Sequence, residues 1–199
     1  MLLSSRPLTR NVLGCGLMLA ALAGCDRQSG PAAQPSAAAS AEGGAPGAEG
    51  ATPGIDTSHK GSRLPDLTFK DPQGGEIRTA TLAGKPLLIN LWATWCGPCV
   101  AELPTLDALA QQRGGALTVL AISEDSAPAA TVAAFLKAHS ASHLVAALDP
   151  DTAASSQWQA QSLPTTIYYG ADGREVWRST GGMDWTGPAA TALLARAAS

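Results

Sequence analysis

The stretch LLINLWATWCGPC, residues 87–99, joins a run of large apolar residues to two closely spaced cysteines. The apolar residues 87–92 predict a strand that is buried on both faces of a sheet. A helix is expected to follow from about residue 98 to residue 112. Cys96 and Cys99, at the start of this helix, can close a disulfide and reopen it. The stretch therefore predicts a protein that exchanges electron pairs with the cysteines of another protein.

The rest of the sequence alternates between strand-like and helix-like segments. Pro72-Gln73-Gly74-Gly75 predicts the turn of an N-terminal β-hairpin, and Ala171-Asp172-Gly173 predicts the turn of a second hairpin near the C-terminus. The further expected strands are 67–69, 76–79, 117–122, 144–148, 165–169 and 175–179, and the further expected helices are 126–139, 152–159 and 188–196. This order predicts an α/β fold in which helices cover both faces of a sheet.

The N-terminus has the pattern of a secretory signal. Arg6 and Arg10 precede the apolar run 12–23, which is too short for an ordinary membrane span and ends in small residues. Residues 1–24 are therefore expected to be removed as a signal peptide, and Cys15 is lost with them.

Cys25 is the expected site of lipidation. The sequence LAGC at residues 22–25 resembles the lipobox of bacterial lipoproteins, in which the cysteine is acylated and becomes the first residue. Plain cleavage after Ala21-Leu22-Ala23 is the alternative, and it leaves Cys25 as a free thiol in an oxidising compartment. Asp26 resembles the inner-membrane retention signal of some lipoproteins. The expected location is therefore periplasmic, with a lipid anchor in a membrane, and Asp26 favours the inner membrane.

Residues 25–60 are rich in Ala, Gly, Pro and Ser and contain almost no large apolar residue. They cannot bury enough surface to offset the entropy of ordering, so they predict a disordered tether, and residues 61–199 predict one domain.

The chain has 13 Lys and Arg against 16 Asp and Glu, and loss of Arg6 and Arg10 leaves 11 against 16, a net charge of −5. This acidic balance argues against a nucleic-acid partner and leaves the lipid on Cys25 as the membrane attachment.

Three segments of the domain together resemble the thioredoxin superfamily. They are residues 88–99, Glu102-Leu103-Pro104 and Leu163-Pro164-Thr165-Thr166. They are most similar to the membrane-tethered TlpA/ResA-like thiol–disulfide oxidoreductases. The resemblance implies a thioredoxin fold, a mixed central sheet with helices on both faces, with an added N-terminal β-hairpin. It also implies an activity that reduces extracytoplasmic disulfides.

Cys96 is the expected nucleophile, and Cys99, one turn deeper on the same helix face, is the expected resolving cysteine. The N–H groups and the positive dipole end of the helix favour the Cys96 thiolate. A structural zinc site is the alternative for the pair, but it requires four ligands and the processed chain has no second cysteine pair. The Gly97-Pro98 insert resembles that of thioredoxin, whose potential is about −270 mV, and so favours a reductant.

Glu102 and Pro164 complete the expected catalytic residues. Glu102 follows Cys99 by three residues, and members of the TlpA/ResA-like group carry a functional glutamate at this spacing. We expect Glu102 to be partly buried, to have a raised pKa and to handle the proton of the thiol pair; a solvated helix carboxylate is the alternative. The resemblance implies that Pro164 is the cis-proline of the family and that the backbone of Leu163 binds a partner's extended peptide. An ordinary trans proline is the alternative.

The resemblance also implies a set of substrate-binding residues beside the dithiol. They are Trp95, Gly97, Pro98, Leu163 and Thr165. Trp92 is expected in the core, whereas Trp95 either contacts a partner or packs in the core. Asn90 stands where thioredoxin has a buried aspartate, and Glu102 is expected to take over the role of that aspartate. Glu124 follows a predicted strand, on the side where α/β folds place their sites; it is expected to be a surface charge, and a supporting position beside the site is the alternative.

No cofactor and no metal ion are expected, because the dithiol is itself the redox group. The expected partners are protein disulfides, such as the haem-binding cysteines of apocytochrome c or copper-site cysteines. A membrane electron donor of the thiol–disulfide transporter type is expected to re-reduce the pair, and the protein is expected to be a monomer. The alternative function is a Cu(I)-binding metallochaperone that uses the same cysteines. Met183 is the single methionine left after processing, fewer than such a chaperone is expected to have.

Overall fold

The computed structural model describes residues 54–197. The predictions for the signal peptide, for Cys25 and for most of the tether lie outside the described residues. The strands are β1 Gly54–Asp56, β2 Thr68–Lys70, β3 Glu76–Arg78, β4 Leu87–Trp92, β5 Thr118–Ser123, β6 Val145–Leu148, β7 Thr165–Tyr169 and β8 Glu175–Thr180. The helices are α1 Gly97–Arg113, α2 Ala129–Ala138, α3 Ala153–Trp158 and α4 Pro188–Ala197, with short 3-10 helices at Thr79–Leu82 and Gly114–Ala116.

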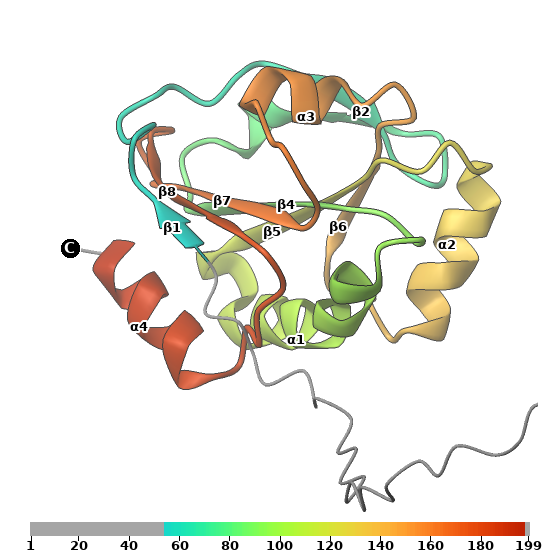
Figure 1. Ribbon diagram of the computed structural model, residues 1–199. Helices are drawn as coiled ribbons and strands as arrows, with labels where there is room; N and C mark the ends of the chain where they lie inside the picture. The colour runs from blue at the N-terminus through green and yellow to red at the C-terminus, as the bar shows by residue number, and fades with distance from the viewer. Residues whose placement is uncertain (1–53, 198–199) are drawn as a thin grey trace, which may run out of the picture. The chain divides into compact units, whose positions relative to one another are not determined.

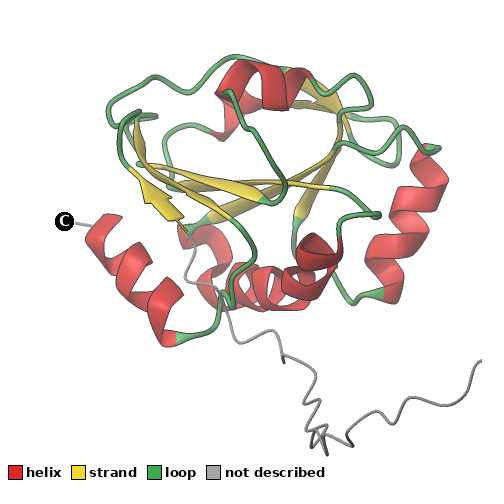
Figure 2. Cartoon of the chain, viewed as in Figure 1, coloured by secondary structure: helices red, strands yellow, loops and turns green. Residues whose placement is uncertain are grey.

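The strands form one mixed sheet in the order β1-β8-β7-β4-β5-β6-β2-β3 (Figure 1). β4, β5 and β6 run parallel to one another, and the other neighbouring pairs are antiparallel. Every residue of β4 is buried, because β5 and β7 flank the strand and helices cover both faces of the sheet (Figure 2). This position explains why residues 87–92 are apolar with a single exception, Asn90.

The side chains of β4 alternate between the two faces of the sheet. Leu88, Asn90 and Trp92 face the layer of α1, α2 and α4, whereas the odd-numbered residues of the strand pack on the opposite face, which α3 covers (Figure 1). The alternation therefore places the amide of Asn90 beneath α1, the helix that carries both cysteines.

The N-terminal boundary of the fold differs from the expectation. Residues 54–60 were expected in the tether, yet Gly54–Asp56 pairs antiparallel with β8, as strand β1. All three residues of β1 are exposed, so the strand is held by backbone hydrogen bonds and not by apolar burial. Composition cannot predict such a strand. The predicted tether therefore does not extend to residue 60, because residues 54–56 are part of the sheet.

The remaining elements lie close to the predicted ranges. β2 and β3 pair antiparallel around the turn of Pro72-Gln73-Gly74-Gly75, and β2 joins the sheet through β6. Helix α2 begins three residues later than expected, because Pro128 has an extended conformation and caps the helix instead of entering it. Among residues 54–197, no helix is both long enough and apolar enough to cross a membrane.

Candidate active site

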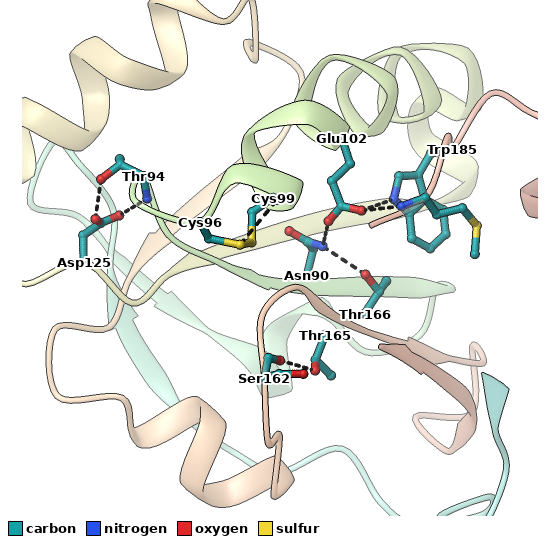
Figure 3. Close-up of a disulfide and its surroundings, with 11 residues drawn as sticks. Asn90, Thr94, Cys96, Cys99, Glu102, Asp125, Ser162, Thr165, Thr166 and Trp185 are labelled. Carbon is teal, nitrogen blue, oxygen red and sulfur yellow. Dashed lines mark hydrogen bonds between the residues drawn. A yellow bond between two sulfur atoms is a disulfide. The ribbon is translucent and has the colours of Figure 1, made fainter. Parts of the chain in front are cut away.

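Cys96 and Cys99 lie where β4 leads into α1 (Figure 3). Cys96 is the N-cap residue of the helix and is 7% exposed, whereas Cys99 lies in the first turn and is 0% exposed. The two residues are joined by a disulfide. One sulfur is therefore near the surface and the other is enclosed by protein.

The start of α1 favours a negative charge on the Cys96 sulfur. The backbone N–H of Cys99 donates a hydrogen bond to Cys96 Sγ over a distance of 3.3 Å. The positive end of the helix dipole acts on the same atom and favours the thiolate. Gly97 and Pro98 are exposed between the cysteines. This geometry supports Cys96 as the nucleophile that meets a partner and Cys99 as the thiol that resolves the mixed disulfide.

The turn before Cys96 is held by Asp125, a residue that was not predicted from the sequence. The buried carboxylate of Asp125 accepts hydrogen bonds from the backbone N–H and the hydroxyl of Thr94, at 2.9 and 2.5 Å, and from the Ser123 hydroxyl at 2.7 Å. Trp92 lies opposite Ser123 in the parallel pair β4–β5, so the ends of the two strands meet here. An acidic residue just beyond the neighbouring strand was the available signal, but it required knowledge of the strand order.

Glu102 lies one turn beyond Cys99 on α1 and is 3% exposed. Its carboxylate accepts hydrogen bonds from Asn90 Nδ2 at 2.7 Å, the Met183 backbone N–H at 3.0 Å and Trp185 Nε1 at 3.2 Å (Figure 3). Burial raises the pKa of Glu102 from 4.5 to about 7, although the three donated hydrogen bonds act to lower it. Both the burial and the raised pKa agree with the expectation from the sequence. This carboxyl can therefore gain or lose a proton near neutral pH.

The loop between β8 and α4 lies against the first turn of α1. A Cβ atom at Gly182 would lie 3.2 Å from the carbonyl oxygen of Pro98, closer than side chains usually approach. Trp185 is buried and stacks on Trp177 with 6.5 Å between ring centroids, and its backbone N–H donates to Thr105 Oγ1 at 3.1 Å. The loop is thus packed on both sides and presents its donors to Glu102 from fixed positions.

A groove with a volume of about 450 Å³ opens beside Cys96. It is lined by Trp95, Cys96, Glu124, Thr152, Ser155, Ala160, Gln161, Ser162 and Leu163. Trp95 is 70% exposed, so it is available to a partner and is not part of the core. Glu124 was expected to be a surface charge, but it is half-buried in the groove wall, where its Oε1 accepts the Ser155 backbone N–H at 3.1 Å.

The segment on the far side of the groove contains the cis peptide bond Leu163–Pro164, as the resemblance implied. Leu163 lines the groove, and Pro164 is buried behind it. Thr165, predicted to contact substrate, is also buried, and its hydroxyl donates to the carbonyl of Ser162 at 2.7 Å. The side chain of Thr165 therefore shapes this loop and does not line the groove.

No group of three or more His, Cys, Asp or Glu within residues 54–197 is arranged to hold a metal ion.

Most of the described chain matches a known protein family. The family model described as Redoxin matches residues 59–194, which is most of the described chain. The chain belongs to the redoxin family.

Curated relatives of this redoxin include thiol–disulfide oxidoreductases. It is 29% identical over 125 residues to the thiol-disulfide oxidoreductase ResA of Bacillus subtilis, over 62% of this chain and 69% of ResA. It is 32% identical over 99 residues to a thioredoxin of Mycolicibacterium smegmatis, over 50% of this chain and 68% of the thioredoxin. The thioredoxin-like protein YneN of Bacillus subtilis is 35% identical over 68 residues, and the chain covers 40% of the length of YneN.

Solved structures show the fold of this redoxin to be that of thioredoxins. The exposed lipoprotein thioredoxin of Streptococcus pneumoniae superimposes with a TM-score of 0.59 at 24% identity, over 66% of this chain and 99% of that one. A secreted disulfide oxidoreductase of Mycobacterium tuberculosis, homologous to DsbE of E. coli, gives 0.57 at 24% identity, over 67% and 95%. The family, the relatives and the Cys96–Cys99 pair identify this redoxin as a thiol–disulfide oxidoreductase.

Proposed function

We propose that this redoxin is a membrane-tethered, extracytoplasmic disulfide reductase. The observation that carries the proposal is the order of three groups along the start of α1: Cys96 near the surface, Cys99 enclosed, and Glu102 buried with a pKa of about 7. Together they provide a nucleophile, a resolving thiol and a proton acceptor. The Gly97-Pro98 insert, which resembles that of the reductant thioredoxin, favours reduction as the direction.

The reaction starts from the reduced pair. The Cys96 thiolate attacks one sulfur of the substrate disulfide, the substrate S–S bond breaks, and one substrate thiolate leaves and takes a proton from water. Cys99 then gives its proton to the Glu102 carboxylate, and the Cys99 thiolate attacks Cys96 Sγ. The mixed disulfide breaks, the second substrate sulfur leaves as a thiolate and takes a proton from water, and the Cys96–Cys99 disulfide forms; Glu102 then releases its proton to water. Two electrons have passed from the protein dithiol to the substrate.

The groove beside Cys96 is suited to an extended peptide around the substrate disulfide. On one side the exposed indole of Trp95 offers a flat apolar contact, and on the other the backbone of Leu163 can pair with the peptide. We infer that these two residues hold the segments that flank the substrate cysteine. Candidate substrates are apocytochrome c cysteines and copper-site cysteines.

The proposed location rests on the N-terminal sequence. Acylation of Cys25 and the residues between it and β1 would hold the domain near a membrane, and a flexible coil of this length reaches about 30 Å. Asp26 favours the inner membrane, where a membrane electron donor of the thiol–disulfide transporter type would re-reduce the pair. One solved structure with a similar fold is an exposed lipoprotein, which supports this location.

Trapping of the mixed disulfide tests the proposed reaction. The reduced full-length chain is mixed with a peptide that carries a disulfide between two cysteines in C-x-x-C spacing. Wild type is expected to reduce the peptide, Cys99→Ser is expected to accumulate a mixed disulfide through Cys96, and Cys96→Ser, the matched control, is expected to form none.

Two results would contradict the proposal. The first is a reduced wild-type chain that leaves the peptide disulfide intact. The second is Cu(I) binding that requires Cys96 without any reduction of the peptide, which favours the metal-carrier alternative.

A further inference from the structure

Asn90 has one end of its amide satisfied and the other end unpaired. Its side chain is 0% exposed, and Nδ2 donates to Glu102 Oε1 at 2.7 Å and to Thr166 Oγ1 at 2.9 Å. Asn90 Oδ1 is buried and has no hydrogen-bond partner among residues 54–197 in the disulfide form. A buried amide oxygen without a donor is costly, so this atom requires an explanation.

The orientation of the amide follows from its neighbours. While Glu102 is ionised it can only accept hydrogen bonds, so in that state the nitrogen of Asn90 faces it and the oxygen points the other way. Figure 3 shows the result: Nδ2 is turned toward Glu102 and Thr166, and Oδ1 is turned toward the disulfide. Cys99 and Glu102 are three residues apart and share a face of α1, and Asn90 contacts Glu102 on that face.

Reduction creates a new donor at this place. When the disulfide accepts two electrons and two protons, Cys99 becomes a thiol whose S–H is enclosed and needs an acceptor. We propose that Asn90 Oδ1 accepts the Cys99 S–H in the reduced protein, so that Asn90 is a positioning residue that holds the resolving thiol at one end and the Glu102 carboxylate at the other. The inference rests on the dithiol chemistry of the family and is independent of the proposed direction of electron flow.

Asn90 does not carry the proton in this arrangement. When Cys96 is in a mixed disulfide, the Cys99 proton passes to Glu102 and the Cys99 thiolate forms the new bond to Cys96 Sγ. Asn90 Oδ1 loses its donor as the protein disulfide forms and regains it when the pair is reduced again. Because the acceptor is satisfied only in the reduced state, Asn90 stabilises the dithiol relative to the disulfide.

The S–H stretching band of the reduced full-length chain tests the contact directly, because the band moves to lower frequency when the thiol donates a hydrogen bond. The Cys99 band is assigned by its loss in Cys99→Ser. It is expected at the hydrogen-bonded frequency in wild type, at the free-thiol frequency in Asn90→Leu, and at or below the wild-type frequency in Asn90→Asp, which keeps an acceptor oxygen. Thr166→Val, which alters only the Nδ2 end, is the matched control and is expected to leave the band unchanged.

The equilibrium with glutathione gives a second readout. In Asn90→Leu the dithiol is expected to be disfavoured about tenfold relative to wild type, which corresponds to a potential about 30 mV more negative. The proposal is overturned by a free-thiol frequency for Cys99 in wild type, a result that needs no variant to fold. It is also overturned if Asn90→Leu leaves the band or the potential unchanged. Both measurements use purified protein without the substrate peptide. Their failure can therefore be distinguished from a failure of the substrate-reduction test.

Discussion

Burial and hydrogen bonding act in opposite directions on the pKa of Glu102. Removal from water raises the pKa of the carboxyl, whereas the donors from Asn90, Met183 and Trp185 lower it. Burial prevails, and the pKa reaches about 7 instead of 4.5. A carboxyl with this pKa can gain and lose a proton near neutral pH, as the proposed exchange with Cys99 requires, whereas a surface glutamate stays ionised.

Replacement of Glu102 is expected to remove part of the pH dependence of stability. Between pH 4.5 and about 7 the folded chain keeps a proton on Glu102 that the unfolded chain has released. Stability is therefore full below pH 4.5 and falls as the pH rises through about 7, by a total of about 3 kcal/mol. Urea unfolding of the oxidised wild type and of Glu102→Gln, from about pH 4 to about pH 8, measures this difference. Parallel stability curves for the two proteins would contradict the raised pKa.

The elements around the site differ in how far the sequence predicts them. β4 is predictable because a central strand needs apolar residues on both faces, and the period of two places Asn90 on the same face as Leu88 and Trp92. β1 is not predictable in this way, because Gly54–Asp56 is held by backbone pairing and buries no side chain. The loop before α4 also lacks a local pattern, because its place depends on the packing of Trp185 against Trp177.

The turn between β4 and α1 is expected to depend on the end of β5. Asp125→Ala leaves the Thr94 backbone N–H without its acceptor, and we expect the free energy of unfolding to fall by about 2 kcal/mol. Thr94→Val removes only the hydroxyl contact and keeps the backbone hydrogen bond, so about half that loss is expected. Urea unfolding of both variants gives the comparison, and equal losses would show that the backbone contact contributes nothing.

Over the whole molecule, the site draws on segments that are far apart in the sequence. Cys96 and Cys99 could be proposed because their spacing along one helix is local, and Glu102 because its spacing from Cys99 resembles that of the TlpA/ResA-like group. Asp125 and Trp185 could not, because each reaches the site only through the order of the strands or the packing of a distant loop. Sequence thus predicts the proposed reacting groups, and the tertiary fold supplies the groups that contact them.

A buried ion pair within β8 also makes a hydrogen bond to α3. Arg178 on β8 donates to both oxygens of Glu175, at 2.7 Å each, and to the carbonyl of Trp158 at 2.5 Å. Arg178→Met leaves the Glu175 carboxylate buried without its partner, and a loss of about 3–5 kcal/mol in the free energy of unfolding is expected. Chemical denaturation of Arg178→Met and of the double variant Glu175→Gln/Arg178→Met provides the test. The double variant should recover part of the loss, and no recovery would contradict a charge-based cost.

The redox state of Cys96 and Cys99 in living cells tests the proposed reductase most directly. Cells are quenched rapidly with acid, free thiols are alkylated, and the fraction of reduced pair is read from the change in mass. The reductase account predicts a pair that is mostly reduced in growing cells and becomes oxidised when the membrane electron supply is removed. A pair that is oxidised with or without that supply would contradict reduction as its role.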